Sequence, residues 1–435
     1  MKMRPFELAL VIAFLGLIIV SLAFLSIYKA KPDDDGIPDI GTVTIWGTLP
    51  ADGIGGLIRA FKEEGDTFKG VTYRQIADDQ FDNELVNALA DGAGPDIIFV
   101  SHERLVALRK RIQPVSYETF PLPDLRTAYL DGAQVFALFD GLYAYPVAAD
   151  PLLMYWNKDI LTTDGFLEAP KTWESLTNDY LPKLIRRNPD RSITRSVVAM
   201  GEYDNVQNSF ALLSTLLLQA GTMGVVDKDA KQYTIRLNES VDGQTQPLRV
   251  SADFYTRFSR PNNSLYSWNR SFSSDKDRFL SEELAMYFGY GSEGIEIEQK
   301  NPNLNFDVAE VPQGAASTVR RTYANFYGLA ALRSSKNLQG AAQVMAVLGN
   351  QENTEKIATA HHMVSVFKAS VAKGSNDIYG RVSYKSAAVA YGWLNPNRPA
   401  TDSIFKTMTQ DLNENRGDQS SVISDVLNRL ELEYN

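Results

Sequence analysis

The first pattern along the chain is an uncharged stretch of about twenty apolar or small residues, Leu8 to Ile27. A helix of this length can span a hydrocarbon core of roughly 30 Å, so we predict a transmembrane anchor in residues 1–28. A cleavable signal peptide is the alternative, because Ser21 and Ala23 are small, but the apolar run continues to Ile27. Basic residues flank both ends, so charge does not determine the orientation of the stretch.

Residues 29–41 are polar and rich in proline, glycine and aspartate, which predicts a linker. From residue 42 the pattern changes to short β-branched or alternating runs separated by runs with helical spacing. The expected strands are Thr42–Trp46, Val71–Ile76 and Pro95–Val100, and the expected helices are Gly55–Glu64 and Phe81–Ala90. This rhythm of strand and helix predicts an α/β lobe with a parallel sheet.

Two further apolar segments, Leu142–Val147 and Leu152–Trp156, flank the dipeptide Asp150–Pro151. We interpret this proline-stiffened joint as a crossing between two lobes, since 435 residues are too many for one ordinary domain. The predicted lobes are 42–150 with about 305–360, and 151–304 with about 361–435.

Two helices are expected in the second lobe. Thr172 is placed to cap a helix over Glu174–Leu184, and Asn205–Ala220 is a strongly apolar helix. Asn205 and Asn208, at the start of that helix, either cap it or point their amides toward a cleft.

The charge and the lack of cysteine exclude several classes of protein. The formal net charge of −10 argues against a nucleic-acid surface, and we interpret Arg109–Arg111 as a solvated helix end. With no cysteine, the chain has no disulfides, thiolate zinc sites or lipid-modified N-terminal cysteine. If the protein is tethered to a membrane, Leu8–Ile27 must hold it there.

Catalytic motifs are also missing. The three histidines, His102, His361 and His362, lack metal-ligand spacing, and Gly289–Gly294 fits a Gly-x-Gly-x-x-Gly pattern without a convincing strand before it. We interpret that segment as a turn. A glycoside hydrolase is a weak alternative, because paired carboxylates such as Glu282–Glu283 are common in an acidic chain and neighbours point apart. We expect no enzymatic activity, no metal and no cofactor.

Four motifs carry a resemblance to a known family: Gly94-Pro-Asp-Ile-Ile-Phe99, Tyr145-Pro146, Tyr155-Trp-Asn-Lys-Asp159 and Pro170-Lys-Thr-Trp173. In this order and spacing they resemble the sugar-binding proteins of bacterial ABC importers, nearest to the maltose/maltodextrin-binding branch. The resemblance implies a two-lobed α/β periplasmic-binding-protein-like fold of type II, whose lobes close on a ligand by hinge motion. It also implies a body on the extracytoplasmic side of the membrane and an ABC permease as partner.

The resemblance implies polar ligand contacts at four positions. Glu103, Arg104 and Asp150 match residues that hydrogen-bond sugar in the maltodextrin branch, and Thr48 follows the first strand where family members place polar contacts. The structural alternatives are a surface ion pair for Glu103 and Arg104 and a hinge cap for Asp150.

The stacking aromatics of that branch are only partly present. Phe405 keeps an aromatic at one stacking position, whereas Val100 and Ser292 stand where the branch has rings. Tyr290 and Trp393 are candidates to compensate, with a core or rim position as the alternative. Maltodextrin itself is therefore in doubt as the ligand.

These observations predict a membrane-anchored extracytoplasmic protein that captures a small solute, preferably a mono- or oligosaccharide, for ABC-transporter uptake. A surface receptor or adhesin with the same fold would need the same cleft. Amines and iron remain open as other ligands.

Overall fold

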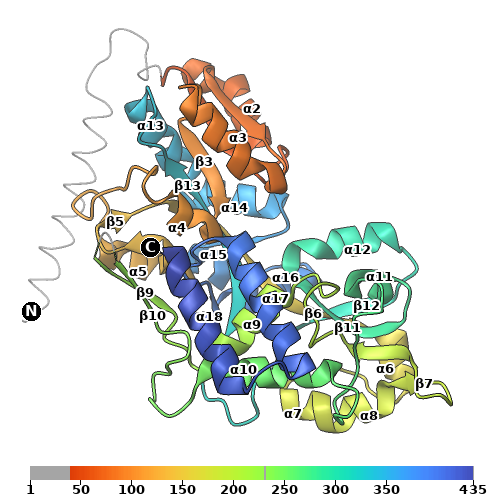
Figure 1. The fold of residues 1–435 in the computed structure, drawn as a ribbon. Coiled ribbons are helices and arrows are strands. Elements are labelled where there is room, and N and C mark those ends of the chain that lie inside the picture. The colour runs from red at the N-terminus through yellow and green to blue at the C-terminus, as the bar shows by residue number, and fades with distance from the viewer. Residues whose placement is uncertain (1–39, 230–231, 435) are drawn as a thin grey trace, which may run out of the picture.

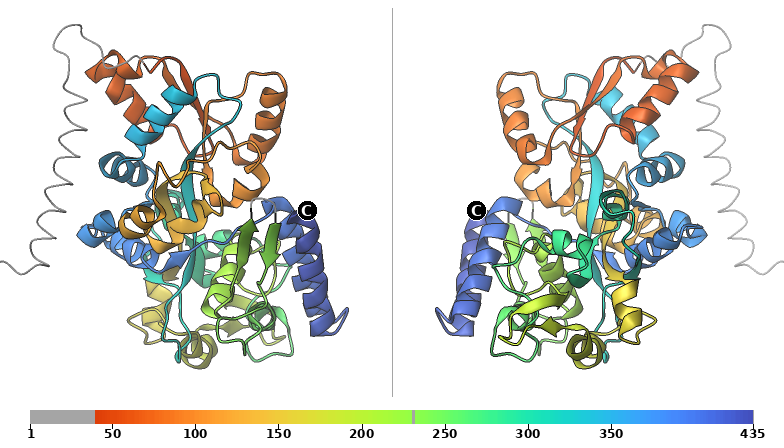
Figure 2. Two further views of the ribbon diagram at one scale, coloured as in Figure 1. Left: turned by 90° about the vertical axis from the view of Figure 1, so that its left-hand side faces the viewer. Right: turned by 90° about the vertical axis from the view of Figure 1, so that its right-hand side faces the viewer.

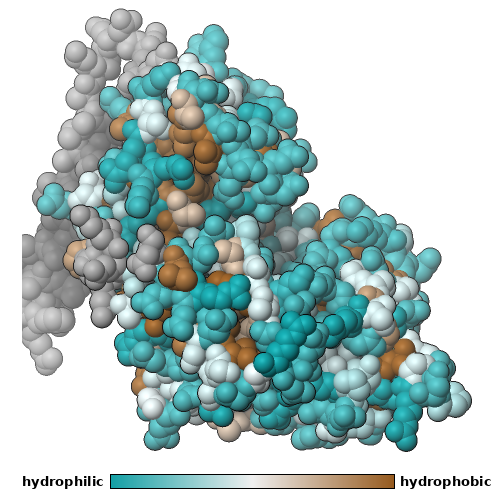
Figure 3. Space-filling view, in the orientation of Figure 1, coloured by the Kyte–Doolittle hydropathy of each residue, from teal (hydrophilic) through white to brown (hydrophobic). Residues whose placement is uncertain are grey.

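The computed structural model describes residues 40–229 and 232–434, which form two α/β lobes (Figure 1). The apolar segment Leu8–Ile27, where we predict an anchor, lies outside the described residues. Within the part of the chain that is described, no helix combines the length and the apolar character needed to cross a bilayer. The surface in Figure 3 is mostly hydrophilic and is indented at the right, where the two lobes meet.

The first lobe is built on three parallel strands in the order β2-β1-β3, with β13 added antiparallel to β3. All five residues of β3 are buried. Ile97 and Phe99 pack on one side of the sheet, and Ile98 and Val100 pack on the other. Burial on both faces explains the continuous apolar run in the sequence. The elements are β1 (Val43–Gly47), α2 (Ile54–Glu64), β2 (Val71–Gln75), α3 (Asp78–Ala90), β3 (Ile97–Ser101), α4 (Leu105–Leu108), α5 (Leu122–Ala128), α13 (Leu338–Leu348), α14 (Gln351–Ala360) and α15 (Lys368–Lys373).

The second lobe surrounds one large hydrophobic cluster, with the apolar helix α9 at its centre. Thr172 caps the helical segment that begins at Trp173 by accepting a hydrogen bond from Ser175 N, as predicted. The elements are α6 (Lys158–Thr163), α7 (Trp173–Ser175), α8 (Leu181–Leu184), β7 (Arg186–Arg187), β8 (Ile193–Val198), α9 (Ser209–Gln219), α10 (Pro247–Thr256), α11 (Asp275–Leu280), β11 (Leu284–Tyr290), α12 (Gly294–Lys300), β12 (Phe306–Glu310), α16 (Ile378–Ala387), α17 (Arg398–Glu414) and α18 (Gln419–Tyr434).

Two long strands, β6 (Tyr145–Asn157) and β13 (Thr322–Ala331), run through both lobes. The first half of β6 pairs with β13 and with β14 (Val364–Ser365), and its second half pairs with β11 and β12. The change of partners falls at Asp150–Leu152. The predicted crossing at Asp150–Pro151 is therefore present, as a kinkless continuation of one strand.

Side-chain packing places the later crossings at other residues than expected. Phe306 and Val308 pack in the core of the second lobe, whereas we expected the chain to enter the first lobe at about residue 305. The crossing lies in β13, where Tyr323 packs in the second core and Ala324 in the first. Val366, expected in the second lobe, packs in the first. The long strand β13 sets this boundary, and its sequence does not mark it.

Arg109, at the end of α4, is buried and connects the two lobes, which corrects our interpretation of Arg109–Arg111 as a solvated helix end. Its guanidinium donates to both oxygens of Asp227, at 2.7 and 3.0 Å, and to Tyr233 Oη at 2.9 Å. Both acceptors belong to the hairpin β9 (Val225–Asp229) and β10 (Gln232–Ile235), which the chain inserts between α9 and α10. Figure 2 shows this hairpin beside α18, where the rings of Tyr233 and Tyr434 lie 5.1 Å apart.

We expect Arg109→Ala to lower the free energy of unfolding by about 3–5 kcal/mol, because it leaves the Asp227 carboxylate buried without its cation. The side chains of Arg109 and Asp227 are only 7% and 5% exposed. Urea denaturation of the full chain measures the change. Lys356→Ala, in the exposed pair with Glu352, is the matched control and should cost less than about 1 kcal/mol. Equal losses in both variants would contradict a stabilising role for Arg109.

Candidate functional site in the interlobe cleft

Glu103 lies directly after β3, at the end of the strand that faces the second lobe. Ser101 Oγ accepts a hydrogen bond from Glu103 N, which fixes the short turn His102–Arg104. The Glu103 carboxylate is buried and accepts hydrogen bonds from Tyr323 Oη and from Arg398 Nη1, the latter at 2.7 and 2.8 Å. Burial opposes ionisation of Glu103, but the charge of Arg398 outweighs it and lowers the pKa of this carboxyl.

Arg398 comes from the second lobe, at the first turn of α17, and sequence reasoning did not select it. Its Nε donates to Asp402 Oδ2 at 2.8 Å, and its guanidinium lies 3.9 Å above the centre of the Phe210 ring. The Glu103–Arg398 ion pair therefore joins the two lobes across the cleft. The only signal in the sequence was an arginine directly after Asn397, which caps α17.

Asp150 lies in β6 opposite Asn325 of β13, at the point where the chain crosses between the lobes. Its carboxylate accepts hydrogen bonds from Ser292 N at 3.0 Å and from Ser292 Oγ at 2.6 Å. Its side chain forms no ion pair among the described residues. Burial therefore raises the pKa of Asp150 to about 7 despite these hydrogen bonds.

Two partly exposed tyrosines complete the site. Tyr290 ends β11, beside the turn that carries Ser292, and Tyr327 lies in β13. Burial is the largest cause of the raised pKa of both phenols, and the charges of Glu103 and Asp150 raise it further. Both rings therefore lie close to both carboxylates. The interlobe cluster consists of Glu103, Asp150, Tyr290, Ser292, Tyr323, Tyr327 and Arg398.

The cluster offers hydrogen-bond donors, acceptors and two phenol rings in one interlobe space. Such a combination suits a small polar solute that has hydroxyl groups and apolar C–H faces. In the part of the chain that is described, no group of three or more histidine, aspartate or glutamate side chains is arranged to hold a metal ion.

Arg104 and Thr48 lie apart from these contacts. Arg104 turns away from Glu103, donates to Asp78 and Asp82 of α3, and lies 5.3 Å above the Phe81 ring. The ion-pair alternative thus describes Arg104, but with carboxylates of α3 as partners. Thr48 lies partly exposed in the bend after β1, and no described hydrogen bond joins it to the interlobe cluster.

The predicted stacking residues Phe405 and Trp393 belong to the core of the second lobe. Phe405 is fully buried, and Trp393 is 5% exposed and donates from Nε1 to Ser214 Oγ at 3.0 Å. Both rings pack against Phe210. Phe405 therefore presents no ring face to a ligand. The sequence could not show this, because ring direction depends on how α17 packs against α9.

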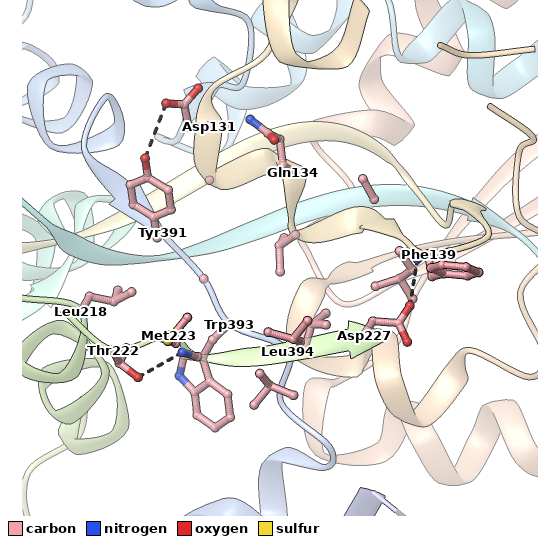
Figure 4. Close-up of a pocket in the computed structure, with 18 residues that line it drawn as sticks. Asp131, Gln134, Phe139, Leu218, Thr222, Met223, Asp227, Tyr391, Trp393 and Leu394 are labelled. Carbon is pink, nitrogen blue, oxygen red and sulfur yellow. Dashed lines mark hydrogen bonds between the residues drawn. The ribbon is translucent and has the colours of Figure 1, made fainter. Parts of the chain in front are cut away.

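Trp393 also borders a second interlobe cavity of about 460 Å³, whose lining includes no residue of the interlobe cluster (Figure 4). Asp131, Gln134 and Phe139 reach it from the first lobe, and Leu218, Met223 and Asp227 reach it from the second. The lining is mainly apolar, and Asp227 is held by Arg109.

The Gly289–Gly294 segment does follow a strand, contrary to our interpretation. It contains the end of β11, a short turn and the start of α12. The Glu293 carboxylate accepts a hydrogen bond from Tyr290 N at 2.7 Å, and Asp150 accepts from Ser292 N. Carboxylates of the chain thus occupy the N–H groups that would bind a phosphate, which is unsuitable for a dinucleotide.

Asn205 and Asn208 bind other parts of the second lobe. Asn208 makes no capping hydrogen bond, and its Nδ2 donates to Phe288 O and to Glu293 Oε1. Asn205 Oδ1 accepts from Trp268 Nε1 at 2.9 Å. Both amides therefore fix the fold of the lobe, and neither caps α9.

The two lobes, the crossing strands and the polar cluster between them define a binding-protein architecture. The family model described as bacterial extracellular solute-binding protein matches residues 52–355. The chain therefore belongs to this family, whose members are binding proteins and not enzymes. The resemblance seen in the sequence is confirmed.

Solved structures share the fold at low sequence identity. A cyclo/maltodextrin-binding protein complexed with maltotetraose has a TM-score of 0.71 and 15% identity, over 92% of this chain and 98% of its own. The maltose-binding protein MalE of Listeria monocytogenes, in complex with maltose, has a TM-score of 0.68 and 18% identity, over 91% and 98%. A solute-binding protein of Thermotoga lettingae bound to α-D-tagatose has 0.66 and 18%, over 91% and 100%. No curated protein matches the sequence significantly.

We expect the melting temperature of the native protein to fall relative to that of Asp150→Asn between about pH 5 and pH 8. Because the pKa of Asp150 is raised to about 7, protonation favours the folded state, and this contribution is lost as the pH rises through that value. Asparagine cannot ionise, so the variant lacks this loss. Asp275, whose pKa burial also raises to about 7, titrates in both proteins and cancels. A constant difference between the two melting temperatures would show that Asp150 does not titrate in this range.

Proposed function

We propose that this protein captures a carbohydrate in the interlobe cleft and delivers it to an ABC importer. The observation that carries the proposal is the interlobe cluster: it lies at the crossing strands of a solute-binding fold and combines Asp150, Ser292 and Arg398 with the partly exposed rings of Tyr290 and Tyr327. Carboxylate, hydroxyl and guanidinium groups match the alternating donors and acceptors of sugar hydroxyls.

The similar structures named above were solved with maltotetraose, maltose or tagatose, which supports a carbohydrate as the ligand class. A neutral polyol also suits the charge of the cluster. Glu103 and Arg398 compensate each other, and Asp150 is surrounded by neutral donors.

We also propose that Leu8–Ile27 anchors the protein in the cell membrane, with the lobes on the extracytoplasmic side beside the permease. The length and apolar character of this stretch support the proposal, as does the lack of a cysteine for lipid attachment. Extracytoplasmic exposure of the lobes agrees with membership in an extracellular solute-binding family.

A thermal-shift screen of the full chain in detergent tests the ligand class. The library should contain mono- to tetrasaccharides, amino acids, polyamines and metal ions. A carbohydrate at about one hundred times its dissociation constant should stabilise the protein by about 2.7 kcal/mol, because it binds only the folded state. Stabilisation by another solute class, with none by any saccharide, would contradict the proposal.

Removing one hydrogen-bonding group from the cleft should weaken binding without unfolding the protein. We expect Tyr327→Phe and Asp150→Asn each to raise the dissociation constant of the identified saccharide roughly three- to tenfold, the effect of one lost hydrogen bond. Isothermal titration calorimetry measures it, with Lys356→Gln as a control on the remote surface. If both cleft variants bind like the native protein, the ligand does not contact this cluster.

A further inference from the structure

The Glu103–Arg398 ion pair is held rigidly at both ends. On the first lobe, Tyr323 Oη and the Ser101 turn fix the position of Glu103. On the second lobe, Asp402 and the ring of Phe210 fix the guanidinium of Arg398. The two side chains are only 10% and 29% exposed, so the pair is not a mobile surface contact.

The groups available to a ligand lie beside this pair. Asp150 with Ser292 and the rings of Tyr290 and Tyr327 form the rest of the interlobe cluster, and the charges of Glu103 and Arg398 both act on Tyr290. The ion pair thus borders a small polar space at the crossing strands. A ligand that extends past it has to separate Glu103 from Arg398.

The cleft also lacks the rings that an extended sugar chain would need. Each further sugar ring exposes another C–H face, which aromatic rings usually cover. Here Phe405 and Trp393 pack in the core of the second lobe, Val100 is buried in the first, and position 292 is a serine. In the interlobe cluster, only Tyr290 and Tyr327 offer partly exposed rings.

We infer that the Glu103–Arg398 ion pair limits the ligand to a short saccharide of one or two rings, with Arg398 as the residue that sets the limit. This inference rests on the proposed function, since it specifies the size of the carbohydrate. Glu103 accordingly acts as part of a bar between the lobes, and Asp150 with Ser292, Tyr290 and Tyr327 holds the sugar.

Calorimetry with saccharides of increasing length tests the inference on the full chain. The probes are a monosaccharide and a disaccharide that the thermal-shift screen identifies, together with glucose, maltose, maltotriose and maltotetraose. The native protein should bind its preferred mono- or disaccharide at least tenfold more tightly than any tri- or tetrasaccharide. A tetrasaccharide that binds as tightly as the shorter sugars would overturn the size limit. Failure of every saccharide to bind would overturn the proposed function as well.

The double variant Glu103→Ala/Arg398→Ala removes both charges together and opens the bar. Its preference for the short sugar over the matching tri- or tetrasaccharide should fall at least tenfold, while the affinity for the short sugar changes less than about threefold. Arg398→Lys keeps a charge opposite Glu103 but is too short to reach Asp402 as well, and should show an intermediate preference. Glu352→Ala/Lys356→Ala, in a remote exposed pair, is the matched control and should keep the native preference. An unchanged length preference in both Arg398 variants would overturn the role of the ion pair.

Discussion

The two lobes depend on a pair of strands that both of them share. β6 and β13 lie side by side at the crossing, and each carries residues of both cores. Their backbone hydrogen bonds are satisfied within the sheet, so the crossing can be buried without leaving unpaired N–H and C=O groups. Asp150 and Tyr327 lie on these strands. The cleft is thus built on the most constrained part of the fold, and the turns that carry Glu103, Ser292 and Arg398 approach it from either lobe.

Charge compensation between the lobes is the second constraint. Arg109 with Asp227 and Arg398 with Glu103 join the lobes at two separate places, and each pair is largely removed from water. Buried ions need partners because their desolvation is costly. Both arginines meet this need with more than one acceptor, and both lie against aromatic rings. Asp150 differs, since it has only neutral donors and keeps a raised pKa. It is the carboxylate of the cluster with the most to gain from a ligand that donates hydrogen bonds.

The fold resembles maltose- and maltodextrin-binding structures over nine tenths of the chain, yet the aromatic surface of its cleft is small. Aromatic residues are present in the relevant segments but pack inward: Phe405, Trp393 and Phe210 form one cluster beneath Arg398. The same helix α17 thus supplies both the core of the second lobe and the guanidinium of the interlobe ion pair. A fold of this kind can keep its backbone while its ligand contacts change, because function depends on a few side chains at the cleft.

Local patterns in the sequence determined the elements of the first lobe, the Thr172 cap and the crossing at Asp150–Pro151. These features depend on interactions between near neighbours, namely β-branched runs, helical spacing and proline stiffness. The motifs from Gly94 to Trp173 were specific enough to indicate the family. Tertiary structure alone decided the partners of Glu103 and Arg109, the inward direction of Phe405 and Trp393, and the crossing at Tyr323–Ala324. Arg398 is 295 positions from Glu103, and Asp227 is 118 positions from Arg109. No local preference of the chain encodes such contacts, because they arise only when helices and strands from distant segments pack together.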